Sequence, residues 1–326
     1  MLFGVSGYTG ATMERLSVIR DELLAELSQC NAGCLSEFSP DRYVAILDKQ
    51  AGNTQAPARY NQAPEEVVAI SKQLLERAGN EYLDSFHKLI LTNLMAGYEE
   101  RVSRLSVPDS IQGLIKKCFS RIIREFDTNP PQFYRFGNDL FHRDLNLARL
   151  TLLPAGPGVV EVQYAPRSLL VRNAQSLEKR ALQFAKGMVL FGLKARGFGP
   201  FYATHADPRT IEEFSPEGWI FFHERVAELL ELNPEMKGLM RSSWYFDPEL
   251  AEISPRLLYL RVMPQENGAE LFYWGSSSDD EDNATAKSAT RRRLVKEGKY
   301  VPTCYYLMWL RQDILKWAKA RREALA

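Results

Sequence analysis

Two segments in the second half of the chain combine aromatic side chains with histidine, arginine and aspartate, which a simple core does not require. The first runs over residues 201–209 and the second over residues 241–248. Each has an aromatic, strand-like stretch that ends in Asp-Pro. Ligands of α/β sheets gather beyond the carboxyl ends of strands, where loops carry polar groups. The two segments are therefore predicted to line one pocket.

The residue types of this pocket suit acid–base or group-transfer chemistry on a small anionic molecule. His205 is the predicted general acid or base, because the unperturbed pKa of histidine is about 6.5. Asp207 or Asp247 is expected to orient it. An arginine clamps a carboxylate or phosphate through two parallel hydrogen bonds, and aromatic rings supply an apolar wall. The residues predicted to bind the substrate are Tyr202, Arg209, Arg241 and Trp244.

The same residues also have a purely structural interpretation, which the sequence leaves open. An aspartate before a proline often caps the next helix, as Asp207 and Asp247 would. In this interpretation Arg241 pairs with Asp247 at the surface. Ser242 and Ser243 lie outside a Gly-x-Ser-x-Gly motif, so a hydrolase nucleophile is not predicted there.

Two short motifs resemble cofactor or metal sites without the elements that such sites need. Residues 4–10 resemble the glycine-rich turn of some nicotinamide-dependent reductases, but only three residues precede them, too few for the strand before that turn. His205 and Asp207 have the H-x-D spacing of the iron/2-oxoglutarate triad. The later His223 follows too soon to complete it. No metal is predicted, and no cofactor can be assigned.

Residues 142–146, His-Arg-Asp-Leu-Asn, resemble the catalytic loop of protein kinases. In that family an asparagine four residues after the leucine binds a metal ion, whereas this chain has Arg149 there. The sequence instead predicts a helix-to-strand junction in which Asp144 caps the helix or pairs locally.

A basic segment begins at about residue 284. From there on, eleven Lys and Arg residues stand against three acids. Its basic helix, strand and helix loosely resemble the small winged-helix modules of excisionase-like DNA-binding proteins, which implies a basic helix in the major groove. A nucleic-acid partner is therefore one hypothesis, and a solvent-facing helix that closes the domain is another. The residues that would contact DNA are Arg291, Arg292, Arg293, Lys296 and Lys299.

The composition is that of a folded globular protein, with 45% hydrophobic and 25% charged residues. Equal numbers of basic and acidic residues, 41 each, exclude a global field that attracts nucleic acid or membranes. The four cysteines lack paired CxxC spacing and are expected to be free thiols. Because no signal peptide or long apolar span is visible, the protein is expected to be soluble and cytoplasmic, with no membrane partner.

The fold class is predicted to be α+β, with a helical part over residues 1–128 and a mixed α/β domain over residues 129–326. The apolar residues from Ile111 to Phe126 recur at spacings of three and four, which indicates one helix. A longer helical stretch is expected over residues 64–105, after a loop over residues 49–63.

The second part alternates strand and helix patterns, which favours a sheet covered by helices. Residues 154–158 are expected to form a hairpin turn, and the acidic residues 276–282 a solvated loop. The expected helices are 176–195, 217–232, 285–297 and 311–324. The expected strands are 147–153, 159–164, 201–204, 239–246, 270–274 and 304–309.

These patterns predict an enzyme of small-molecule metabolism, including secondary metabolism, that acts on an anionic substrate. A DNA-binding or regulatory protein and a ligand-binding sensor without catalysis are the alternatives. The substrate, the reaction type and the oligomeric state are not assigned by the sequence.

Overall fold

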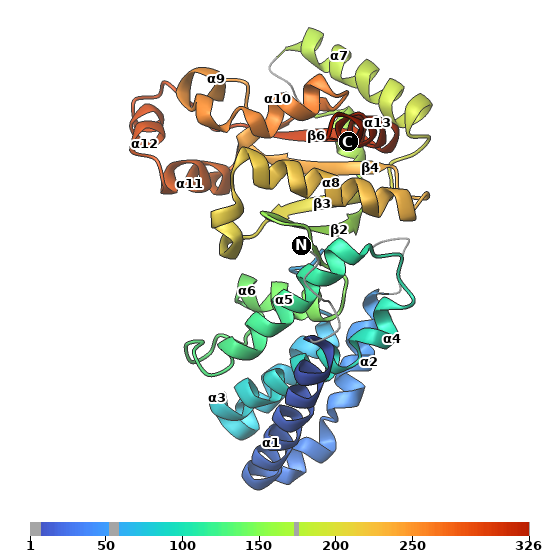
Figure 1. Ribbon diagram of the computed structural model, residues 1–326. Coiled ribbons are helices and arrows are strands. Elements are labelled where there is room, and N and C mark those ends of the chain that lie inside the picture. Colours follow the sequence, from blue (N-terminus) through green and yellow to red (C-terminus); the bar gives the residue numbers. More distant parts are fainter. Residues whose placement is uncertain (1–7, 52–58, 173–175, 326) are drawn as a thin grey trace. The chain divides into compact units, whose positions relative to one another are not determined.

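The computed structural model describes residues 8–51, 59–172 and 176–325 (Figure 1). The chain forms two compact units, Met1–Pro154 and Ala155–Ala326. The N-terminal unit is helical and the C-terminal unit carries a mixed sheet with helices, so the predicted α+β class is confirmed. No helix among the described residues is long and apolar enough to cross a membrane.

The N-terminal unit is built around a long helix, α3, on which α1 and α2 pack. The helix predicted from Ile111 to Phe126 is confirmed. The helical stretch predicted over residues 64–105 is also confirmed, with a break at Gly97 and an end at Val102. Of the predicted loop, residues 52–58 lie outside the described residues, and α2 extends into its beginning. The helices are α1 (Tyr8–Glu37), α2 (Pro40–Ala51), α3 (Glu65–Ala96), α4 (Tyr98–Val102), α5 (Asp109–Glu125) and α6 (Asp139–Ala148).

Two predictions about residues 142–153 are wrong. The kinase-like residues lie inside α6, and the helix continues to Ala148 where a strand was expected. The helix ends because the carbonyl of Asn146 accepts the N–H groups of Thr151 and Leu152. The carboxylate of Asp144 lies 2.6 Å from the guanidinium of Arg121 on the neighbouring helix α5.

A network of buried polar side chains joins α2 to α3. His87 Nδ1 lies 2.7 Å from the carbonyl oxygen of Tyr134, which can only accept, so Nδ1 carries the proton and donates it. His87 Nε2 lies 3.0 Å from the Tyr43 hydroxyl and 3.1 Å from the Ser71 hydroxyl. Burial lowers the pKa of His87 to about 4.

The pKa of His87 predicts a loss of stability in acid. Below its usual pKa of 6.5 the unfolded chain binds a proton that the folded, neutral imidazole does not, so falling pH favours unfolding. The loss accumulates between pH 6.5 and 4 and reaches on the order of 3 kcal/mol. Urea unfolding at pH 7 and pH 4.5 measures it. We expect His87→Gln to lose less stability over this interval than the wild type, and equal losses would contradict the assignment.

The C-terminal unit carries most of a mixed sheet with the strand order β1-β2-β3-β4-β6-β5. β3 and β4 are parallel and are joined by a helix, whereas β2 with β3, β4 with β6, and β5 with β6 are antiparallel. The last five predicted strands are confirmed, except that residues 244–246 of the predicted strand 239–246 form a 3-10 helix. The turn before β2 is also confirmed, and Ala155 N–H donates to Gly158 O there. The strands are β1 (Leu153–Pro154), β2 (Gly158–Gln163), β3 (Phe201–Ala206), β4 (Gly238–Ser243), β5 (Glu270–Gly275) and β6 (Cys304–Leu310).

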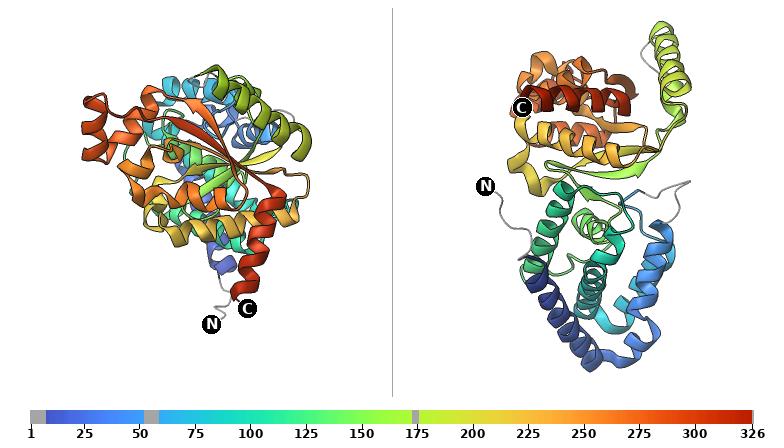
Figure 2. Two further views of the ribbon diagram at one scale, coloured as in Figure 1. Left: turned by 90° about the horizontal axis from the view of Figure 1, so that it is seen from above. Right: turned by 45° about the vertical axis from the view of Figure 1, so that its right-hand side comes forward.

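Helices cover both faces of this sheet (Figures 1 and 2). One face packs on a π-helical segment, η3 (Met188–Lys194), which continues α7. The other face packs on α8 and α13, where Trp309 of β6 meets Trp317 with ring centroids 5.5 Å apart. The helices are α7 (Leu177–Gly187), α8 (Pro216–Leu232), α9 (Leu250–Ile253), α10 (Tyr259–Glu266), α11 (Ser278–Ala286), α12 (Ala289–Lys296) and α13 (Arg311–Leu325).

The acidic residues 276–282 were predicted as a loop, and this is wrong. Residues 278–286 form α11, because Ser277 caps it by accepting the N–H of Asp280 and because acids in a first turn complement the helix dipole. The predicted helix 285–297 is likewise two helices, since Ser288 caps a new one, α12.

Side chains of α7 bind the backbone of the edge strand β5. The Gln183 amide donates to Tyr273 O over 3.1 Å and accepts the Tyr273 N–H over 3.0 Å. Lys186 donates to Leu271 O and pairs with Glu270 at 2.7 Å. These bonds fix one side of α7 against the sheet.

Candidate functional site

The parallel strands β3 and β4 part before they end. Their backbone pairing runs from Tyr202 opposite Leu239 to Thr204 opposite Arg241. The last two residues of β3 pair only with β2, and the last two of β4 only with β6. The carboxyl ends of parallel strands are where α/β sheets bind ligands. The residues at this divergence are therefore the candidate site.

Arg241 lies at the point of divergence and is 5% exposed. Its guanidinium carbon lies 3.9 Å from the ring centroid of Trp219 on α8 and 5.0 Å from that of Phe246. The guanidinium makes no hydrogen bond or ion pair with any described residue, and Asp247 is not its partner. Burial lowers the pKa of Arg241 to about 9, so the side chain remains a cation at neutral pH.

Burying a cation without an anion destabilises the folded state by several kcal/mol. Contacts between the cation and aromatic rings offset only about 2 kcal/mol of this. Two further donors next to Arg241 are also buried without a hydrogen-bond partner in the described parts of the chain, namely Thr204 Oγ1 and Trp219 Nε1. The three groups come from β4, β3 and α8 and lie on one face of the sheet. Such a set of donors complements an anion that accepts hydrogen bonds.

A histidine–carboxylate pair lies on the opposite face of β3. His205 Nε2–H donates to Glu161 Oε1 over 2.8 Å, so the neutral imidazole carries its basic lone pair on Nδ1. The Glu161 side chain is 5% exposed and that of His205 is 31% exposed. A buried carboxylate that orients a reachable imidazole is the usual arrangement of a general base. Sequence reasoning missed Glu161, although an acid among the valines of β2 was a signal.

The two aspartates predicted to orient His205 bind backbone instead. Asp207 accepts the N–H of Arg209 over 3.0 Å at the start of a 3-10 helix, η4 (Pro208–Glu213). Asp247 accepts the N–H groups of Glu249 and Thr303 over 3.0 and 3.1 Å. Burial raises the pKa of Asp247. Both contacts are the capping and turn roles of the structural interpretation.

The remaining predicted binding residues are spread over the C-terminal unit. Tyr202 is buried within β3, where burial raises its pKa. Arg209 lies 3.4 Å from the carboxylate of Asp207. Trp244 belongs to a separate cluster, in which the guanidinium of Arg291 lies 4.7 Å from its ring centroid. Only Arg241 of this set lies where β3 and β4 diverge.

The basic residues of the DNA-binding hypothesis serve several local contacts. Arg291 is buried and donates to a backbone carbonyl and a serine hydroxyl. Arg292 donates to two carbonyls at the end of α11. Arg293 and Lys299 are exposed and pair with Glu297 at 3.9 and 2.9 Å. Nucleic-acid binding by this segment stays a prediction, and it has fewer exposed cations than the sequence implied.

Candidate metal ligands are not clustered in the described structure. No group of three or more His, Cys, Asp or Glu side chains there is placed to hold a metal ion. The four cysteines are free thiols, and burial raises the pKa of Cys304 to about 12.

No model of a known protein family matches the chain, and no curated protein matches it. Two solved structures resemble it. One is an acyltransferase in complex with decanoyl-CoA, with a TM-score of 0.45 and 13% identity over 83% of this chain and 76% of that chain. The other is an acyltransferase in complex with CoA and 10C-teicoplanin, with a TM-score of 0.46 and 11% identity over 83% of this chain and 77% of that chain. Similarity at this level carries no argument about activity.

Proposed function

We propose that the C-terminal unit is a group-transfer enzyme whose donor carries a phosphate or a similar anion that Arg241 binds. The buried, unpaired guanidinium of Arg241 is the observation that carries this proposal. An unpaired cation in a buried position destabilises the fold, and an anionic ligand that pairs with it would offset this loss of stability. The position at the carboxyl ends of parallel strands supports the same function.

His205 would act as the general base. In the proposed reaction the acceptor gives its O–H or N–H proton to Nδ1 of His205, and Glu161 stabilises the imidazolium that forms. The acceptor forms a bond to the transferred group while the bond between that group and its leaving group breaks. His205 and Arg241 lie on opposite faces of the sheet. The donor bound by Arg241 and the acceptor beside His205 would therefore reach each other around the diverging ends of β3 and β4.

Binding of coenzyme A and of inorganic pyrophosphate tests the role of Arg241. We use coenzyme A because it joins phosphates to a thiol that carries transferable groups. Either probe is expected to raise the melting temperature of the wild type. Arg241→Met should bind coenzyme A at least about 30-fold more weakly, since truncating a buried charge partner costs about 2–5 kcal/mol. Titration calorimetry measures the affinity.

The same variant should fold more stably than the wild type without ligand. Methionine fills a similar volume and removes an unpaired cation, so we expect a gain of about 1–2 kcal/mol after the aromatic contacts are lost. Arg293→Met, at a side chain 69% exposed, is the control and should change neither property. If neither probe bound the wild type, or if Arg241→Met bound as tightly as the wild type, the proposed role of Arg241 would be wrong.

A further inference from the structure

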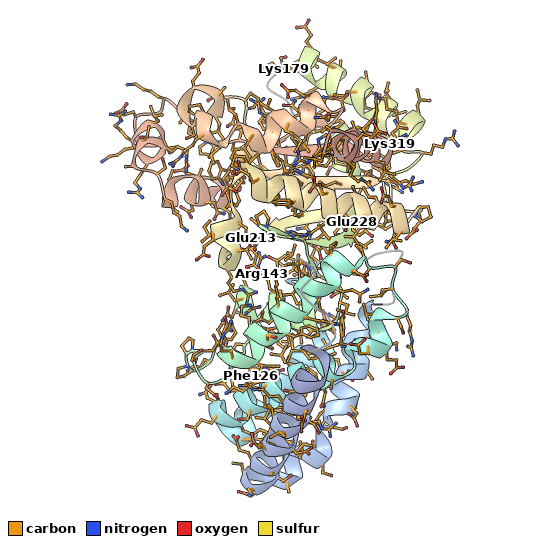
Figure 3. All side chains as sticks on the ribbon, viewed as in Figure 1. Phe126, Arg143, Lys179, Glu213, Glu228 and Lys319 are labelled. Carbon is orange, nitrogen blue, oxygen red and sulfur yellow. The ribbon has the colours of Figure 1, made fainter. Side chains whose placement is uncertain are left out.

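A concentrated apolar surface lies on α7 and its continuation η3. Six large apolar side chains there are at least 45% exposed, and three of them at least 70%. We call this set the α7 surface: Leu177, Leu182, Phe184, Met188, Val189 and Leu193. α7 lies at the outer edge of the C-terminal unit in Figure 2, and Lys179 on it is labelled in Figure 3. A stretch of this kind marks an interaction site rather than ordinary surface.

The stretch around this surface is strongly basic, although the chain as a whole is not. Residues 165–200 contain seven Lys and Arg and one acid, Glu178. Two acids from elsewhere lie against this stretch: Glu270 pairs with Lys186 at 2.7 Å, and Asp313 interacts with the charge of Lys194. The guanidinium carbon of Arg172 lies 4.0 Å from the ring centroid of Trp274, and this contact leaves the positive charge of Arg172 in place. Positive charge therefore remains beside the apolar side chains.

We propose that the α7 surface docks on an anionic lipid membrane. A helical segment of residues 177–194 with exposed Leu, Phe and Met beside Lys and Arg has the composition of helices that lie in the membrane interface. Its charge complements anionic headgroups. A second copy of the chain is a poorer occupant, because a symmetric contact would bring two basic stretches together. No membrane partner was expected from the balanced charge of the whole chain. That balance does not reveal the local excess of basic residues over residues 165–200.

Co-sedimentation with lipid vesicles tests the docking. One set contains phosphatidylcholine alone, and the other an equal mixture of phosphatidylcholine and phosphatidylserine. The wild type is expected to pellet with the anionic vesicles, less so at high salt, and to remain in solution with the neutral ones. The double variant Leu182→Glu/Leu193→Glu should partition at least about tenfold more weakly, since it replaces apolar contacts with like charge.

Val301→Glu is the matched control, because Val301 is 62% exposed and belongs to the segment between α12 and β6. It should pellet like the wild type, and circular dichroism should show that both variants fold. The proposal is overturned if the wild type stays in solution with anionic vesicles or if the double variant pellets as well as the wild type. Light scattering that shows a dimer lost in the double variant, without vesicle binding, would assign the surface to a second copy. Arg241 takes no part, so the outcome is independent of the proposed function.

Discussion

His205→Ala is expected to lower kcat by about 10²–10⁴-fold, the usual contribution of a general base. The affinity for coenzyme A should stay the same, because His205 lies on the face of β3 opposite to Thr204 and Arg241. The variant should also fold, since the side chain of His205 is 31% exposed. Release of the thiol from acetyl-CoA, with a panel of amine and alcohol acceptors, measures turnover.

Glu161→Gln separates orientation from charge at the same place. Its amide oxygen can still accept the Nε2–H of His205, so the imidazole stays in position, but the counter-charge of the imidazolium is lost. We expect a smaller fall in kcat than for His205→Ala. The acidic limb of the pH profile should move to lower pH, because the general base acts only when unprotonated and the lost carboxylate no longer favours its protonation. A variant with unchanged kcat and pH profile would show that Glu161 serves only to satisfy a hydrogen bond. Unchanged turnover in His205→Ala would remove this histidine from the mechanism.

Asp144→Ala is expected to destabilise the N-terminal unit by about 3 kcal/mol. Asp144 is buried, and its carboxylate lies 2.6 Å from the guanidinium of Arg121. Removing one partner of a buried ion pair leaves the other charge in a poorly solvated site, which costs about 3–5 kcal/mol. Arg121 retains Glu125 at 2.7 Å, so we expect the lower end of that range. The ion pair with Asp144 raises the pKa of Arg121.

Urea unfolding at neutral pH measures this loss. Glu100→Ala is the control, because Glu100 pairs with Arg104 on an exposed helix surface. Exposed pairs of this spacing contribute only about 0.3–0.5 kcal/mol. Similar losses in the two variants would mean that the buried pair contributes no more than a surface pair.

The sequence predicted the sheet well because its strands have short, apolar and aromatic patterns bounded by turn residues. β6 is an example, since residues 304–310 are almost entirely apolar and the strand is buried between β4 and β5. The errors come from residues whose pattern suits two structures. Leu147 and Ala148 are apolar neighbours in either a strand or a buried helix, and the capping role of Ser277 depends on one hydrogen bond.

The candidate site was predictable only in part. Sequence reasoning named Arg241 and His205, because each belongs to a strand-like segment with aromatic residues that ends in Asp-Pro. It did not give the partner of either residue, since partners depend on strand register. Glu161 lies on the strand next to His205, 44 residues earlier in the chain. Among the described residues Arg241 has no acidic partner, because aromatic side chains of α8 pack over β4 at this position. No local sequence pattern predicts that packing.

The hydrogen bonds between Gln183 and Tyr273 also protect the protein from aggregation. β5 is the last strand of its sheet, and the open edge of a sheet is a template on which a strand of another molecule can add. One side-chain amide engages both the N–H and the carbonyl of Tyr273, as a neighbouring strand would. α7 thus closes the middle of this edge to fibril-like growth, so the helix that presents apolar surface to its surroundings also protects the sheet from self-association.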